Sequence, residues 1–187
     1  MAGPISPKET TYGGTTFRSR LEAKWAVCFD TAGVKWQYEP FILKCQTTGW
    51  TYTPDFYITS NKGCFVVEVK PNYPSAEYTK QLSYWSASLK ELLYPVSTSI
   101  HILCGNFYDI PIVAYKLQNT KPVPISLSFL FPRYLMGLQQ ASAYRFDLEN
   151  PNGSQGLHKL PPRPPTSKGS YGVSRRRSKS PKRKRRR

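Results

Sequence analysis

Residues 53–70 read TPDFYITSNKGCFVVEVK, and this stretch decides the predicted fold. Aromatic and β-branched residues flank residues 61–63, Asn-Lys-Gly, a composition typical of a tight turn. The pattern predicts a β-hairpin with one strand from Trp50 to Ile58 and the other from Cys64 to Lys70. Pro54 interrupts the first strand, because proline has no N–H for the ladder.

The segments on either side of this hairpin predict two long helices and more strands. Apolar residues recur at helical spacing from about Thr16 to Ala32, with Thr16 as the expected N-cap and Gly33 as the C-cap. A second apolar stripe predicts a helix over residues 75–93. We also expect strands over 35–43, 99–104 and 111–117, a short helix over 134–147, and a loose leader over 1–14. This order predicts an α/β fold with a mixed central sheet flanked by helices.

The positive charge of the chain is concentrated near its C-terminal end. Of the 27 Lys and Arg residues, 13 lie in residues 159–187, which hold no Asp or Glu, whereas residues 1–158 hold 14 against 11 acidic residues. From residue 150 onward Pro, Ser, Gly, Arg and Lys dominate, so this segment cannot bury enough apolar surface to offset its ordering entropy. We therefore expect a folded domain over 1–149 and a disordered basic tail over 150–187.

Cysteine spacing and hydropathy argue against several classes of protein. The four cysteines do not have the spacing of a zinc knuckle, and the N-terminal residues do not resemble a signal peptide. Reduced structural thiols are therefore expected. No apolar run approaches the ~18 residues that a membrane-spanning helix needs, so no membrane partner is expected. A reducing, aqueous compartment fits both observations.

Charged residues on the predicted hairpin form a candidate site. Glu68 and Lys70 lie two residues apart on one strand, so their side chains point to the same face. Alone, such a pair is usual on a solvated face, but the hairpin brings Asp55 alongside Glu68, and a lone Asp is unfavourable in an aromatic strand unless it has a role. Glu22 borders the apolar stripe of the first helix and is expected to face the sheet. A surface ion pair with Arg18 explains Glu22 equally well.

Three carboxylates and a lysine that converge from a helix and two strands have the chemistry of a divalent-metal site. Hard oxygen ligands suit Mg²⁺ or Mn²⁺, and such an ion activates water for attack on a phosphodiester. Lys70 would hold that water or offset the charge that develops on phosphorus. The expected metal ligands are Glu22, Asp55 and Glu68, and the expected catalytic residues are these three with Lys70.

Three motifs resemble the PD-(D/E)xK nuclease superfamily: FRSRLEAKWA at 17–26, PDF at 54–56 and VEVK at 67–70. In particular they resemble phage and bacterial endonucleases with an acidic residue on the first helix, including Holliday-junction resolvases of the endonuclease I type. The resemblance covers about residues 12–105, and no motif element is missing. It implies a restriction-endonuclease-like core and an active site around one or two divalent metals. The matching positions are Glu22, Asp55, Glu68 and Lys70.

The resemblance implies a Mg²⁺-dependent endodeoxyribonuclease, a phosphodiester hydrolase that acts on branched or replicating DNA or processes genomes for packaging. Resolution of a junction needs two cuts, which makes a homodimer the expected assembly for that activity. Two alternatives stay open. One is a non-enzymatic nucleic-acid-binding or virion protein on a nuclease-like fold, and the other is a nuclease directed at RNA. The complete set of four motif residues favours an enzyme over the first alternative.

Further residues are candidates for contact with nucleic acid. Arg18 and Arg20 open the first helix, where backbone N–H groups favour phosphate, although ordinary surface charge explains them as well. Gln81 borders the apolar stripe of the second helix and is a candidate to orient the site. These three assignments depend on position alone.

The basic tail has its own expected partners. Residues 175–187 hold ten Lys or Arg in thirteen positions, and such a run binds polyanions without sequence preference. Its two clusters also resemble a bipartite nuclear localisation signal. That resemblance implies a nuclear import receptor as partner and the nucleus of a eukaryotic host cell as location. A phage-like nuclease with a nuclear-type tail suggests a virus of eukaryotes as source. The cluster residues are Arg175, Arg176, Arg177, Lys182, Arg183, Lys184, Arg185, Arg186 and Arg187.

Overall fold

The structure is a computed structural model, and it describes five segments of the chain. These segments are residues 7–45, 49–60, 62–93, 98–108 and 111–146. The predicted basic tail, including both clusters of residues 175–187, lies outside them. The first six residues of the predicted leader and Asp147 also lie outside them.

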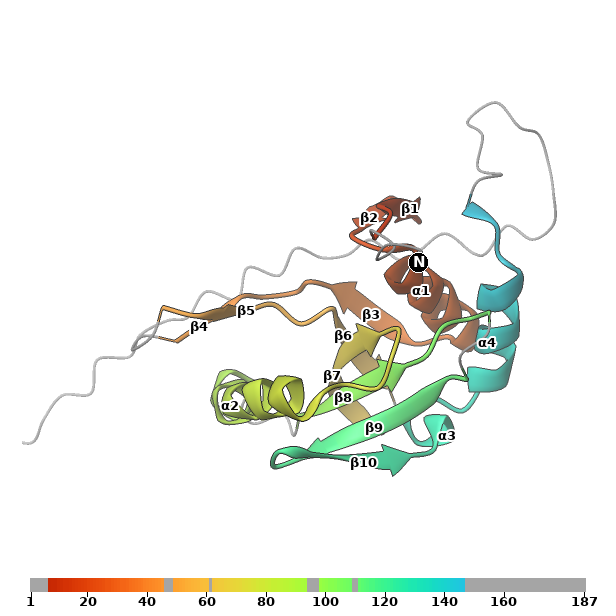
Figure 1. The fold of residues 1–187 in the computed structure, drawn as a ribbon. Coiled ribbons are helices and arrows are strands. Elements are labelled where there is room, and N and C mark those ends of the chain that lie inside the picture. The colour runs from red at the N-terminus through yellow and green to blue at the C-terminus, as the bar shows by residue number, and fades with distance from the viewer. Residues whose placement is uncertain (1–6, 46–48, 61, 94–97, 109–110, 147–187) are drawn as a thin grey trace, which may run out of the picture. The chain divides into compact units, whose positions relative to one another are not determined.

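A six-stranded mixed sheet organises the described part of the chain (Figure 1), as the sequence predicts. Its strand order is β10-β9-β8-β7-β6-β3. The strands are β3 (Lys35–Tyr38), β6 (Phe56–Ser60), β7 (Gly63–Lys70), β8 (Thr98–Cys104), β9 (Val113–Gln118) and β10 (Lys121–Ile125). Strands β7 and β8 pair in parallel, and the other neighbours in this sheet are antiparallel.

The predicted hairpin is confirmed as β6 and β7. Phe56 pairs with Val67, and the Cα pairing of the two strands does not continue beyond this point. Pro54 has no N–H to donate, so the first predicted strand divides into β5 (Thr51–Tyr52) and β6. Asp55 therefore lies at the break just before β6 and not in the middle of a strand.

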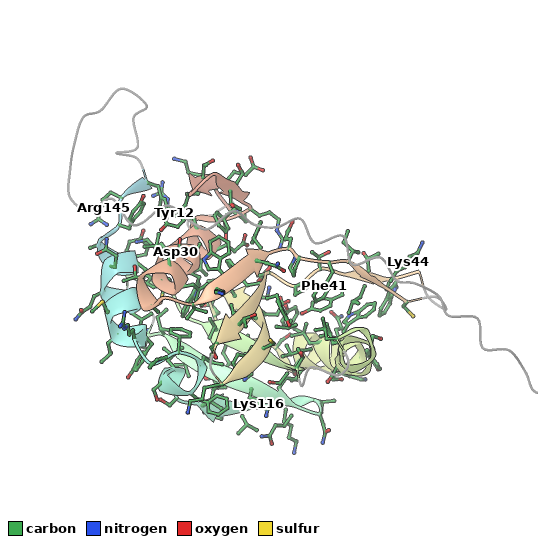
Figure 2. All side chains as sticks on the ribbon, turned by 180° about the vertical axis from the view of Figure 1, so that it is seen from behind. Tyr12, Asp30, Phe41, Lys44, Lys116 and Arg145 are labelled. Carbon is green, nitrogen blue, oxygen red and sulfur yellow. The ribbon has the colours of Figure 1, made fainter. Side chains whose placement is uncertain are left out.

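Helices cover both faces of the sheet (Figure 1). Phe65, Val67 and Val69 of β7 face the core that includes α1 (Arg20–Ala32), α3 (Leu127–Leu130) and α4 (Tyr134–Ala143). Val66 faces the opposite core, beneath α2 (Ala76–Leu92), and the strand alternation puts Glu68 and Lys70 on that same face. Side chains fill the space between the helices and the sheet on both sides (Figure 2).

The start of the first helix differs from the prediction. Helix α1 begins at Arg20 because Ser19 is its N-cap, and the Ser19 hydroxyl accepts the Glu22 N–H at 3.2 Å. Thr16 lies instead in β2 (Thr15–Phe17), which pairs with β1 (Thr10–Tyr12). The expected helix start at Thr16 and the expected loose leader at residues 10–12 were therefore wrong, because this short hairpin precedes the helix.

The C-terminal end of α1 and the N-terminal end of α2 lie where the sequence predicts them. Gly33 is the C-cap of α1 with a φ of 72°, and the Val34 N–H donates to the Phe29 carbonyl at 2.9 Å, which matches a glycine-capped helix end. Ser75 caps α2, where Leu82 and Leu89 are buried.

The C-terminal half of the sheet was only partly predicted. The expected strand over 111–117 is β9, which lies one strand inside the edge. The edge is β10, whose Pro122 and Pro124 argue against a strand in the sequence but are tolerated at a sheet edge. Helix α3 was also missed. None of the described helices is long and apolar enough to cross a bilayer.

Candidate active site

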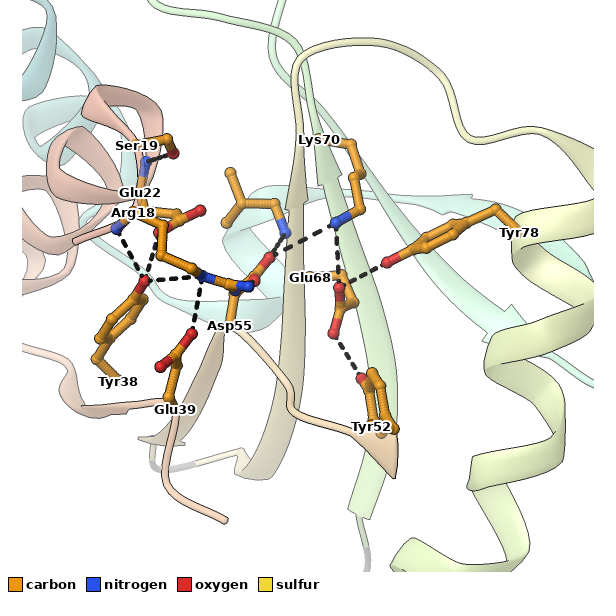
Figure 3. A network of polar contacts seen from close by, with 11 residues as sticks. Arg18, Ser19, Glu22, Tyr38, Glu39, Tyr52, Asp55, Glu68, Lys70 and Tyr78 are labelled. Carbon is orange, nitrogen blue, oxygen red and sulfur yellow. Dashed lines mark hydrogen bonds and ion pairs between the residues drawn. The ribbon is translucent and has the colours of Figure 1, made fainter. Parts of the chain in front are cut away.

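Asp55, Glu68 and Lys70 meet at one place beside the end of β7 (Figure 3). The Lys70 Nζ lies 3.3 Å from Oε2 of Glu68 and 3.9 Å from Oδ2 of Asp55. Each acidic residue is 3% exposed, whereas 31% of the Lys70 side chain is exposed. Two buried carboxylates thus face one partly exposed ammonium group.

The Asp55 side chain extends the β6–β7 ladder past the break at Pro54. Its Oδ2 accepts the Val69 N–H at 2.8 Å, so a backbone donor that β6 does not reach is satisfied by a carboxylate. The Asp55 carbonyl accepts the Glu39 N–H at 3.1 Å. The carboxylate is consequently held at the strand end, next to Lys70.

The electrostatic surroundings of Asp55 favour a neighbouring cation. Burial, followed by the negative charge of Glu68, raises the pKa of Asp55 to about 7. Lys70 and the Val69 N–H oppose this rise, and the charge of Glu22 adds to it. The negative charges of Glu68 and Glu22 therefore act on Asp55, and additional positive charge would stabilise its ionised form.

Two tyrosines hold the carboxylate of Glu68. Tyr52 donates to Oε1 and Tyr78 donates to Oε2, each at 2.6 Å. The Tyr52 ring stacks on Trp85 with 5.7 Å between centroids, and the Tyr78 ring centroid lies 4.9 Å from the Lys70 Nζ. Burial and the Glu68 charge raise the pKa of both hydroxyl groups, so both remain protonated donors.

Glu22 joins the site through Tyr38. Glu22 lies in the first turn of α1 and is 9% exposed, and its Oε2 accepts the Tyr38 hydroxyl at 2.6 Å. The same hydroxyl accepts the Arg18 backbone N–H at 3.1 Å and the Arg18 Nε at 3.3 Å. Burial and the hydrogen bond to Glu22 raise the pKa of Tyr38 to about 12, which keeps it a donor to Glu22.

Arg18 connects this group to Asp55. Its Nη2 lies 2.8 Å from Oδ1 of Asp55, and its Nε lies 2.8 Å from Oε1 of Glu39. The Glu22–Arg18 ion pair considered from the sequence is replaced by these contacts, because Arg18 precedes the helix and does not share its face. Figure 3 shows Arg18 between Tyr38, Glu39 and Asp55.

The other predicted contacts lie further from the chemistry. Arg20 is the first residue of α1 and is half-buried, and Gln81 is exposed on α2. The α2 residue that reaches the carboxylates is Tyr78. Sequence reasoning missed the roles of Tyr38 and Tyr52, because strand alternation does not distinguish an aromatic ring in a core from one whose hydroxyl reaches a buried acid. The acidic residues themselves could have indicated these roles, because a buried carboxylate requires hydrogen-bond donors nearby.

Two of the three predicted ligands present carboxylate oxygens, the donor type that a hard divalent cation prefers, on one side of the site. Oδ2 of Asp55 and Oε2 of Glu68 both face the Lys70 ammonium, so they point toward a common position that accepts positive charge. Among the residues that the structure describes, no three His, Cys, Asp or Glu side chains are grouped closely enough to hold an ion. Hydrogen bonds through Tyr38 and Arg18 connect Glu22 to Asp55. The chain matches no protein-family model, no curated protein and no solved structure.

Proposed function

We propose that the protein is a divalent-metal-dependent endonuclease that hydrolyses phosphodiester bonds in DNA. The supporting observation is the placement of Lys70, whose partly exposed ammonium lies 3.3 Å and 3.9 Å from two buried carboxylates. Burial of a second carboxylate beside the first costs free energy, and such costs concentrate at functional sites. A site that binds a cation and a phosphate accounts for this cost.

The proposal assigns a role to each residue. When bound, Mg²⁺ or Mn²⁺ supplies Lewis-acid stabilisation and lowers the pKa of a water ligand. Asp55 and Glu68 would hold the ion, and Glu22 is the third candidate ligand. Lys70 keeps a positive charge at the exposed side of the carboxylates, where it can offset charge that develops on a phosphate. The tyrosines at Glu68 orient its carboxylate.

Cleavage of supercoiled plasmid and of a synthetic four-way junction tests the proposal. The wild-type protein should cut with Mg²⁺ or Mn²⁺ and stop when EDTA is added. Lys70→Ala and Glu68→Gln should each lower the rate about 100-fold or more, because the first removes a positive charge beside the reacting phosphate and the second removes the charge of a proposed metal ligand. The controls Lys35→Ala and Glu77→Gln remove the same charges from exposed positions and should keep the wild-type rate.

The alternative role as a nucleic-acid-binding or packaging protein has one observation in its favour. The Arg18 Nη2 lies 2.8 Å from Oδ1 of Asp55, an ion pair that a purely structural role also explains. If the wild type and all variants bind DNA equally and none cuts it, the enzyme is ruled out and this alternative stands. Cutting of RNA in place of DNA would change the substrate, and a preference for junctions would support a resolvase that works as a homodimer.

The basic tail contributes proposals that depend on the sequence alone. Residues 175–187 are proposed to bind DNA without sequence preference and to engage a nuclear import receptor. A comparison of the full chain with residues 1–149 separates the two functions. Cleavage should persist in the shorter protein, whereas salt-sensitive binding and nuclear accumulation in a eukaryotic cell should be lost.

A further inference from the structure

Arg18 is an exposed cation that covers a buried acid. Its side chain is 57% exposed, while the Asp55 side chain beneath it is 4% exposed. The Arg18 Nη2 donates a hydrogen bond to Oδ1 of Asp55 at 2.8 Å, and the other oxygen, Oδ2, accepts the Val69 N–H. Both oxygens of Asp55 are therefore engaged: on the solvent side the guanidinium covers Oδ1, and the Lys70 Nζ lies 3.9 Å from Oδ2.

Glu39 holds the guanidinium in this place. Its Oε1 lies 2.8 Å from the Arg18 Nε, and its own N–H donates to the Asp55 carbonyl. Glu39 has a φ of 44°, a left-handed conformation that is uncommon outside glycine and that concentrates at functional positions. This backbone turn directs a second carboxylate at Arg18, so Arg18 has an anchor that does not depend on Asp55.

A divalent cation and the guanidinium compete for the same carboxylate. A cation on Asp55 would lie close to the positive charge of Arg18, and like charges at short range repel strongly where water is partly excluded. Phosphate is the group that draws an arginine away, because its oxygens match the guanidinium donors and carry the opposite charge. Since Arg18 is more than half exposed, it can turn toward a ligand in solvent while the core around Asp55 stays packed.

We propose that Arg18 keeps divalent cations from Asp55 until a phosphodiester binds the guanidinium, so that phosphate binding and metal binding are coupled. This inference rests on the proposed function, because it takes Asp55 as a metal ligand. Glu39 keeps Arg18 at the site during the exchange. The consequence is a site that binds metal weakly when no nucleic acid is present.

The test is a calorimetric titration of the full chain with Mn²⁺ in the absence of nucleic acid. Arg18→Gln removes the charge but keeps a polar side chain beside Tyr38 and Asp55, and it should bind Mn²⁺ about fivefold more tightly than the wild type. Arg18→Lys retains the charge and should stay within about twofold of the wild type. Arg133→Gln is the matched control, because it removes an exposed arginine at the N-cap of α4.

A second titration adds a phosphorothioate DNA duplex, which resists hydrolysis. The duplex should tighten Mn²⁺ binding about fivefold in the wild type and in Arg18→Lys, and leave Arg18→Gln unchanged. Asp55→Asn with the same duplex measures the Mn²⁺ that the DNA itself takes up. Thermal denaturation of each variant verifies the fold, and if Arg18→Gln does not fold, the duplex response of Arg18→Lys still decides.

The outcomes separate this inference from the proposed function. It is overturned if Arg18→Gln binds Mn²⁺ no more tightly than the wild type, if neither protein binds Mn²⁺, or if the duplex strengthens binding equally in both. If the wild type cuts DNA but Arg18→Gln has an unchanged Mn²⁺ affinity, the nuclease activity stands and the coupling is ruled out. If Arg18→Gln binds Mn²⁺ more tightly but the wild type does not cut DNA, the coupling stands and the nuclease activity is ruled out.

Discussion

The hydroxyl of Tyr78 donates a 2.6 Å hydrogen bond to Oε2 of Glu68, the same oxygen that faces the Lys70 ammonium at 3.3 Å. Tyr52 donates a hydrogen bond of the same length to the other oxygen, Oε1. A helix and a separate short strand therefore set the orientation of one carboxylate on β7. This orientation determines which lone pairs of Glu68 remain available to a ligand.

For the proposed nuclease, we expect Tyr78→Phe to lower the single-turnover rate of DNA cleavage about tenfold, because groups that orient a metal-binding carboxylate typically contribute 10- to 100-fold. Tyr52→Phe should act similarly, and the double variant should lose more than either. The control is Tyr84→Phe, on the same helix but exposed. Unchanged rates in both single variants would show that Glu68 is held by packing alone.

His101 should make stability depend on pH. Its ring is fully buried against Phe65, and burial, followed by the charge of Lys116, lowers its pKa to about 4, while the Ser99 backbone opposes this shift. The unfolded chain takes up this proton near pH 6.5 and the folded protein only near pH 4. The free energy of unfolding should therefore fall as pH drops between these values, by on the order of 3 kcal/mol.

The measurement is urea unfolding at pH 7 and pH 4.5 for the wild type and His101→Leu. The variant should lose less stability on acidification, since every other titrating group is shared by the two proteins. Equal losses in both would show that His101 is protonated in the folded state.

Gly137 should not tolerate a side chain. A Cβ at this position would lie 2.6 Å from the Cys28 carbonyl oxygen and 2.7 Å from its Sγ, so α4 packs against α1 at a distance that only glycine permits. Gly137→Ala should lower the free energy of unfolding by about 1–3 kcal/mol, as overpacking does, despite the better helix propensity of alanine. Gln139→Ala, exposed on the same helix, should change it by less than about 0.5 kcal/mol in the same urea titration.

Lys24 should stabilise the end of α4. The residue is 1% exposed, and its Nζ donates to the carbonyls of Ala141, Ser142 and Tyr144 at 2.5, 3.1 and 3.4 Å. These are carbonyls at a helix C-terminus, where positive charge is favourable. Lys24→Met keeps the length but leaves them without this donor, so unfolding should require about 1–3 kcal/mol less.

Chemical denaturation of Lys24→Met is compared with Lys35→Met, in which the replaced lysine is exposed. Burial lowers the pKa of Lys24 to about 8, so burial of the charge also has a cost. A Lys24→Met protein as stable as the wild type would mean that this cost equals the contribution of the three hydrogen bonds.

Part of the site could be predicted because it depends on one hairpin. The short connection between β6 and β7 sets their pairing, and that pairing places Asp55 beside Glu68, with Lys70 on the same face. The contact between these three residues follows from a period of two and a short loop, both of which are local properties of the chain. The contacts of Arg18 could not be predicted in this way, because they depend on where α1 begins and how it lies against the sheet.

The sequence by itself determined the central hairpin, the two long helices and the C-cap at Gly33, since alternation, helical periodicity and capping act between residues near one another in the chain. The tertiary structure decided that Tyr38 and Tyr52 donate to Glu22 and Glu68 and that Arg18 covers Asp55. Those contacts join residues 16 to 37 positions apart. They form because a buried carboxylate must find donors wherever the packed elements bring them, and no local pattern specifies which donors these are.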